Sequence, residues 1–137
     1  MSTEKPRLVS LREVEGKMSP HQGQLERALK LRAEALAFVD DVEELARYIG
    51  GQAEESGTGN DWSVVKEIFP GIKVHLAFKG ADDEFPANLR ALFSGEKLEL
   101  ISAEDLVSFV IPIVSHMLRY VRQANPGKKL PEVCYRV

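Results

Sequence analysis

A histidine followed by an acidic run is the first feature of this sequence that could do chemistry. His75 lies in a stretch whose apolar alternation predicts a β-strand, and Asp82, Asp83 and Glu84 follow it in a loop. A histidine beside carboxylates can serve as a general base or as part of a metal site. If the loop folds back onto the strand, these four side chains predict a ligand-binding site on the open face of a sheet.

The same residues also have a structural interpretation, which we favour. His75 would be an exposed residue on the polar side of its strand, between Lys73 and Ala77. The acidic run would be a solvated loop, in which Phe85 inserts into the core and Pro86 leads into the next strand. One histidine with loop carboxylates supplies few ligands, so we expect no cofactor, although the residue types leave metal binding open.

The remaining candidates lack the neighbours that catalysis requires. Cys134 is the single cysteine, and the sequence places no base or cation beside it. The glycine-rich segment 56–59 lies between a helix and a strand, whereas a phosphate-binding loop runs from a strand into a helix. No nucleotide-binding, hydrolase or metalloprotease motif is present, which favours a protein that is not an enzyme.

Composition and charge exclude several classes of protein. The chain has 137 residues, with 18 Lys and Arg against 21 Asp and Glu, and this mild acidic excess argues against a nucleic-acid partner. A single cysteine cannot close an internal disulfide, which predicts a reducing, cytoplasmic setting. The most apolar stretch, 106–118, is shorter than the roughly 20 residues of a membrane span, so we expect no membrane partner.

The element with the strongest pattern is a helix from Pro20 to Ile49. Its apolar residues form a heptad-like seam that runs from Ala28 to Ile49. An unbroken helix would be about 45 Å long, whereas a compact chain of this size has a radius of gyration of about 14 Å. The helix therefore either overhangs and meets a second copy of the chain, or breaks at Asp40 and Asp41, where Asp40 could cap a second helix. We expect a homo-oligomer, most simply a homodimer, through this seam.

Short strands should follow this helical segment and form an antiparallel meander. The segment 52–61 is polar and glycine-rich and predicts a loop. Alternation and turn residues then predict strands at 62–69, 72–78, 89–93 and 97–101. Pro70 and Gly71 fit a type II turn between the first two.

A second, largely apolar helix completes the predicted fold. Ser102 can cap it, and Asn125, Pro126 and Gly127 end it. The expected fold class is α+β, with a small antiparallel sheet of about four strands packed against a long N-terminal helix and a buried C-terminal helix. The whole chain, 1–137, is one domain with an arm (1–18), a helical segment (19–50), the sheet with its helix (62–124) and a tail (125–137).

Four short motifs in the second half of the chain occur in a characteristic order and spacing. They begin at Glu67 (EIFPG), Asp83 (DEFPA), Leu92 (LF) and Ala103 (AEDL). In this respect the segment from Trp62 to Leu118 resembles a prokaryotic family of domains of unknown function, DUF3786. The family's Leu-Phe pair is often followed by Asp, whereas Ser94 follows here. The resemblance implies a small α+β domain and no catalytic residues.

Together these observations predict a small, homodimeric, non-enzymatic module that binds a protein or a small ligand. One alternative is a metal- or cofactor-handling accessory protein that uses His75 with Asp83 and Glu84. A second is a small hydrolase or isomerase with a base on the sheet face. That enzyme would need a deep pocket lined by His75 and a carboxylate.

Overall fold

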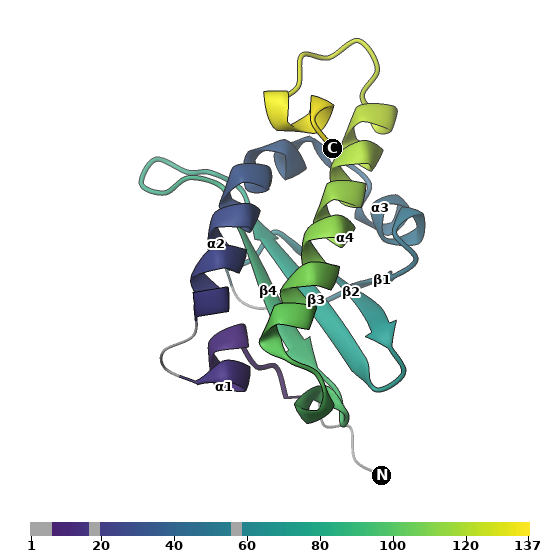
Figure 1. Ribbon diagram of the computed structural model, residues 1–137. Coiled ribbons are helices and arrows are strands. Elements are labelled where there is room, and N and C mark those ends of the chain that lie inside the picture. The colour runs from purple at the N-terminus through teal and green to yellow at the C-terminus, as the bar shows by residue number, and fades with distance from the viewer. Residues whose placement is uncertain (1–6, 17–19, 56–58) are drawn as a thin grey trace.

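The computed structural model describes residues 7–16, 20–55 and 59–137 and shows a sheet with helices across one face (Figure 1). The strands form one antiparallel sheet in chain order: β1 (Gln52–Glu54), β2 (Trp62–Phe69), β3 (Ile72–Lys79) and β4 (Asn88–Ser94). The α-helices are α1 (Leu11–Glu15), α2 (Pro20–Ala33), α3 (Val42–Tyr48) and α4 (Ala103–Ala124). Three short 3₁₀ helices join or follow them: η1 (Glu34–Phe38), η2 (Leu98–Leu100) and η3 (Glu132–Tyr135). The predicted α+β class and the four-stranded antiparallel sheet are confirmed.

The N-terminal helical segment is broken, so of the two alternatives the break is the one observed, and the long N-terminal helix of the expected fold is not formed. α2 ends at Ala33, η1 continues to Phe38, and α3 begins at Val42. The carboxylate of Asp41 accepts a hydrogen bond from the Glu44 N–H at 3.0 Å and so caps α3. The break falls at the predicted place, but the capping residue is Asp41 rather than Asp40.

The break turns the predicted apolar seam into part of the protein's own core. Ala35 and Leu45 are fully buried and Ile49 is nearly so, whereas Leu31 is 70 % exposed. With the helix broken, its length no longer supports a dimer, and the homodimer stays a prediction.

The first strand of the sheet, β1, lies in the segment 52–61, which was predicted to be a loop. β1 lies at Gln52–Glu54 and pairs with β2, Gln52 opposite Val65. Gly51 allows this approach, because a Cβ there would come within 2.4 Å of the Val65 carbonyl oxygen.

The segment 97–101, predicted to be a strand, instead contains the 3₁₀ helix η2. The chain turns at Gly95, whose φ is +128°, and Lys97 donates its N–H to the carbonyl oxygen of Gly71. This hydrogen bond draws the segment across the end of the β2–β3 hairpin instead of alongside β4. At that end Gly71 has a φ of +86°, in agreement with the predicted turn.

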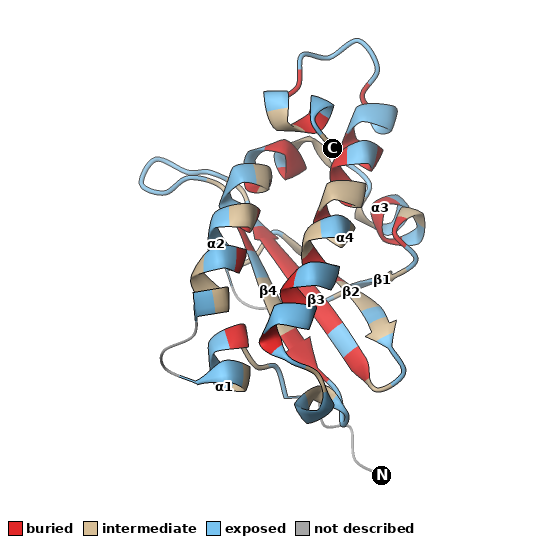
Figure 2. Ribbon diagram, in the orientation of Figure 1, coloured by how far each residue is buried: buried red, intermediate tan, exposed pale blue. Residues whose placement is uncertain are grey.

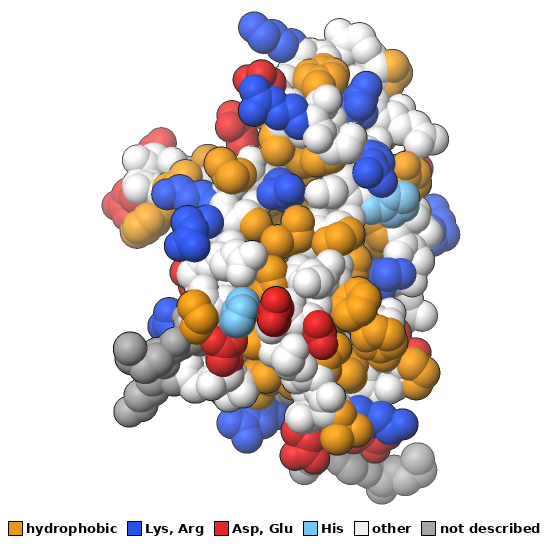
Figure 3. All heavy atoms as spheres, in the orientation of Figure 1, with side chains coloured by type: hydrophobic (Ala, Val, Ile, Leu, Met, Phe, Trp, Pro, Cys, Tyr) orange, Lys and Arg blue, Asp and Glu red, His pale blue; other side chains and the backbone are white. Residues whose placement is uncertain are grey.

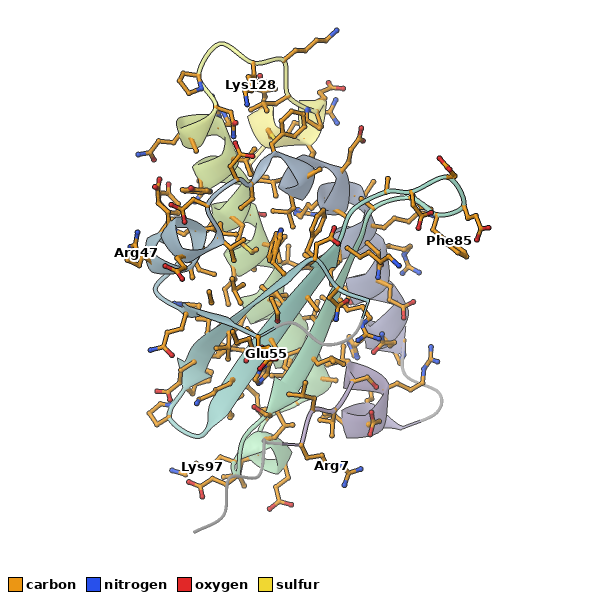
Figure 4. The ribbon with its side chains drawn as sticks, turned by 180° about the vertical axis from the view of Figure 1, so that it is seen from behind. Arg7, Arg47, Glu55, Phe85, Lys97 and Lys128 are labelled. Carbon is orange, nitrogen blue, oxygen red and sulfur yellow. The ribbon has the colours of Figure 1, made fainter. Side chains whose placement is uncertain are left out.

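The helices cover one face of the sheet, so every second residue of β3 is apolar and packs against them. Its four buried apolar residues on that face, with 0–5 % exposure, are Ile72, Val74, Leu76 and Phe78. α2 and α4 lie across this face in Figure 1, and β3 beneath them is mostly coloured as buried in Figure 2. Figure 4 shows the sheet from its opposite face. Ser102 caps α4 as predicted, with its hydroxyl accepting from the Asp105 N–H at 3.1 Å.

The N-terminal segment closes only part of the sheet's outer edge. Val9 forms an isolated antiparallel bridge with Phe93 on β4. Ser10 then caps α1, which turns the chain away from β4 at Leu11. In the part of the chain that the structure describes, no helix is long and apolar enough to cross a membrane.

Two leucines of the predicted seam allow a test of where that seam is buried. Leu45→Ala should lower the free energy of unfolding by about 2–5 kcal/mol, because Leu45 is fully buried in the core. Leu31→Ala should change it by less than about 0.5 kcal/mol, because Leu31 lies in solvent. Urea denaturation measures both values, and a large, concentration-dependent loss in Leu31→Ala would show instead that Leu31 lies in a subunit interface.

Candidate functional site

His75 lies at the centre of a polar network on the face of the sheet away from α2 and α4. Its Nδ1 is 2.8 Å from Oε1 of Glu54, and its Nε2 is 2.7 Å from Oγ of Ser94. The Ser63 hydroxyl donates to the same Glu54 oxygen at 3.1 Å. His75 is 5 % exposed and Ser94 is 2 % exposed, so the prediction that His75 is an exposed strand residue is wrong.

Sheet register explains how four strands each supply one member of this network. Glu54 on β1 is opposite Ser63 on β2, which is opposite Ala77 on β3. Glu54 therefore reaches diagonally across β2 to His75, two residues from Ala77 on the same face. On the other side of β3, Ser94 of β4 is opposite Lys73, which lies two residues before His75 on the same face, so Ser94 also reaches His75 diagonally. In Figure 4 Glu55, the residue after Glu54, lies over the middle of this face.

The order serine, histidine, carboxylate is also that of a hydrolase triad. A nucleophilic serine must reach the substrate's carbonyl carbon with its Oγ. At 2 % exposure, Ser94 has no room for a substrate beside its hydroxyl. Among the described residues every buried side-chain polar atom has a hydrogen-bond partner, as expected of a network that holds strands together.

The acidic loop does not meet His75. His75 lies four residues before the end of β3, about 13 Å along the strand, and the loop projects beyond that end (Figure 1). Asp82 accepts hydrogen bonds from the N–H groups of Phe85 and Glu84, which hold the pKa of its carboxyl below the usual value. Asp83 lies between Asp82 and Glu84 in the sequence, and all three side chains are exposed.

The tip of this loop is solvated rather than packed. Phe85 is 64 % exposed and lies at the projecting end of the loop (Figure 4), so the prediction that it inserts into the core is wrong. Within the described residues, no three His, Cys, Asp or Glu side chains cluster closely enough to hold a metal ion. A ligand-binding role for Asp82, Asp83 and Glu84 stays a prediction.

A groove lies between α2, the edge strand β4 and the base of the acidic loop; we call it the α2–β4 groove. Its volume is about 620 Å³, within the roughly 300–1,000 Å³ of typical ligand sites. The apolar side chains on its floor come from α2 and β4: Leu25, Leu29, Leu89 and Ala91. The exposed aromatic ring of Phe85 also lines it.

The rim of the α2–β4 groove is mainly basic. Lys30, Lys79 and Arg90 contribute three cations to the lining, against one carboxylate, that of Glu26, which gives the lining a net charge of +2. All four residues are exposed, and basic side chains lie on α2 beside the base of the projecting loop in the space-filling view (Figure 3). Such a site favours a ligand that combines an apolar part with a negative charge.

The lone cysteine is buried and far from being an activated thiol. Cys134 in η3 is 0 % exposed, and this burial raises the pKa of its thiol, with a smaller opposing effect of Arg122. Of the glycine-rich segment predicted not to bind phosphate, residues 56–58 lie outside the described residues.

Fold and groove define a small α+β protein with a four-stranded meander, helices on one face and a basic groove at its β4 edge. The chain matches the model of a domain family of unknown function (DUF3786) over residues 2–116 and belongs to that family. The resemblance seen from Trp62 to Leu118 is thus confirmed, and the family also covers the N-terminal helical segment. No curated protein and no solved structure matches this chain.

Sequence patterns missed most of the residues that the structure assembles. Glu54 was assigned to a loop because a three-residue strand shows no alternation, and Ser94 lay just outside the strand predicted at 89–93. The groove joins Lys30 on α2 with Arg90 on β4, sixty residues later in the chain. Arg90, the charged residue between Leu89 and Ala91, was the one available signal that a face of this strand is exposed.

Removal of the serine hydroxyl tests the structural role of the His75 network. Ser94→Ala leaves Nε2 of a buried histidine without its partner, which should cost about 1–3 kcal/mol of unfolding free energy. Ser108→Ala is the matched control, since Ser108 is exposed on α4, and should cost less than about 0.5 kcal/mol. Equal stability of the two variants in urea would show that the network does not hold the strands.

Reaction of Cys134 with a thiol reagent should report its burial. Because the folded protein raises the thiol pKa, less thiolate is present at pH 8 in the folded than in the unfolded chain. The reagent should therefore react slowly with folded protein and rapidly in urea. The raised pKa also affects stability. Above the pKa of the unfolded chain, the unfolded state loses the thiol proton more readily than the folded state, so the free energy of unfolding falls as the pH rises; below that pKa the thiol has no effect. Rapid reaction of folded protein would contradict the burial.

Proposed function

We propose that this protein is a non-enzymatic binding module and that the α2–β4 groove is its binding site. The observation that carries the proposal is the combination of an apolar floor and a basic rim in one groove of about 620 Å³. Apolar area supplies affinity in such sites, and a few charged groups orient the ligand. The ligand proposed is a molecule or segment with an apolar part and a negative charge.

The groove lining favours binding over catalysis. Its described residues include no histidine and no cysteine, and they contain a single carboxylate, that of Glu26, which accepts a hydrogen bond from Gln22 at 2.7 Å. The hydroxyl of Ser10 accepts the N–H of Glu13 in the cap of α1. The lining therefore holds no pair of nucleophile and base of the kind that covalent catalysis uses.

A fluorescent anilinonaphthalene sulfonate dye, which is both apolar and anionic, can test the groove directly. It should bind the folded protein saturably, and the double variant Lys30→Glu, Arg90→Glu should bind it about tenfold more weakly, because two exposed cations are reversed. Arg119→Glu reverses an exposed charge on α4 outside the groove and should leave binding unchanged.

Thermal melting of each variant checks that the fold is retained. Absence of dye binding to the folded protein, or equal weakening by Arg119→Glu, would contradict the proposed site.

A further inference from the structure

Among residues 7–16, 20–55 and 59–137, no strand lies beside part of the outer edge of β4, and this part lines the α2–β4 groove. Phe93 exchanges two backbone hydrogen bonds of 2.8 Å with Val9, so its N–H and C=O point away from β3. In an antiparallel strand these groups alternate in direction from one residue to the next. Leu89 and Ala91 therefore also point their backbone groups away from β3 and toward the groove.

The N-terminal segment cannot cover this part of the edge. In the antiparallel register that pairs Val9 with Phe93, Leu11 would lie opposite Ala91. Leu11 instead begins α1, whose cap Ser10 turns the chain away from β4. Among the described residues, the structure records no hydrogen-bond partner for the outward backbone groups of Leu89 and Ala91.

Leaving this edge unpaired has a cost, because water reaches it only in part. Ala91 is partly exposed, whereas Leu89 is only 4 % exposed although it lies on an edge strand. An unpaired backbone N–H or C=O that is shielded from water costs free energy comparable to a lost hydrogen bond. A ligand that carries its own backbone donors and acceptors satisfies these groups, whereas a purely apolar ligand does not.

We infer that the α2–β4 groove binds an extended peptide segment of alternating apolar and acidic residues, which adds to the sheet as a fifth strand beside β4. This inference rests on the proposed function and names the class of ligand for the same groove. Extended peptides bind open sheet edges in this way, with main-chain hydrogen bonds for affinity and alternate side chains for specificity.

The two faces of β4 specify the side chains of the added strand. Leu89 and Ala91 are on the helix side, opposite the buried Phe78 and Leu76, so peptide side chains on this side enter the apolar floor. Arg90 points to the other face, where a directly adjacent peptide residue meets a cation. The pattern apolar, acidic, apolar matches this order.

The length of the open edge limits the segment that pairs with it. The Val9–Phe93 bridge closes the edge at one end, and the loop before Asn88 closes it at the other. Leu89 and Ala91 are about 7 Å apart along the strand, so about three peptide residues pair there. A pentapeptide is therefore long enough to occupy the site.

The test uses a fluorescently labelled pentapeptide of alternating Val and Glu that has Val at its first, central and last positions, so that the central N–H faces β4, with binding to the full-length protein measured by anisotropy. We expect saturable binding that is lost when Lys replaces Glu. Methylation of the central backbone nitrogen removes one donor and keeps every side chain, and should weaken binding about fivefold to tenfold. On binding, the amide protons of Leu89 and Ala91 should become protected from hydrogen exchange.

Variants of the edge give the matched comparison. Ala91→Pro removes an outward N–H without touching the β3–β4 hydrogen bonds and should weaken the peptide about fivefold to tenfold, whereas Ala91→Gly keeps the N–H and should bind within about twofold of the native protein. If Ala91→Pro does not fold, the methylated peptide and the amide protection decide the matter alone.

The dye separates failure of this inference from failure of the proposed site. Dye binding without peptide binding, or peptide binding unaffected by backbone methylation, would overturn the added strand and leave the groove as a binding site for small anions. Absence of both kinds of binding would overturn the site itself.

Discussion

The fold depends on the break between α2 and α3, where the carboxylate of Asp41 holds the first turn of the second helix. A straight helix could place one stripe of its apolar residues on the core, and the rest would lie in solvent. The break lets α2 pack beside α4 while α3 turns toward β1 and β2. β1 follows α3 directly, so the same break sets where Glu54 meets the sheet.

The sheet has two faces with different physical requirements. The inner face packs on the helices and is entirely apolar along β3. No helix of the described residues lies over the outer face, yet His75 is buried there, because side chains from β1, β2 and β4 close around it. A buried imidazole without partners would destabilise the protein, and the two hydrogen bonds to its ring nitrogens remove that cost. The same arrangement makes Ser94 inaccessible, which separates it from the hydrolase triad that it otherwise resembles.

The β4 side of the molecule combines features that stable sheet proteins usually avoid. An open strand edge invites pairing with another chain, and natural proteins commonly protect it with charges or a covering segment. Here the N-terminal bridge covers Phe93, and Arg90 supplies a cation on the remaining part of β4. The groove beside that edge and its net positive charge are the features that support the proposed binding of an acidic, extended segment.

Local patterns in the sequence determined the α+β class, the β2–β3 hairpin with its turn at Gly71, the cap of α4 at Ser102 and the break before α3. Each of these depends on neighbours within a few residues, through alternation, capping or a positive φ. The tertiary structure alone decided that Gln52–Glu54 is a strand, that His75 meets Glu54 and Ser94 instead of the acidic loop, and that Lys30 and Arg90 share a groove. These outcomes depend on strand register and helix packing between residues far apart in the chain, where a shift of one residue moves a side chain to the opposite face of the sheet.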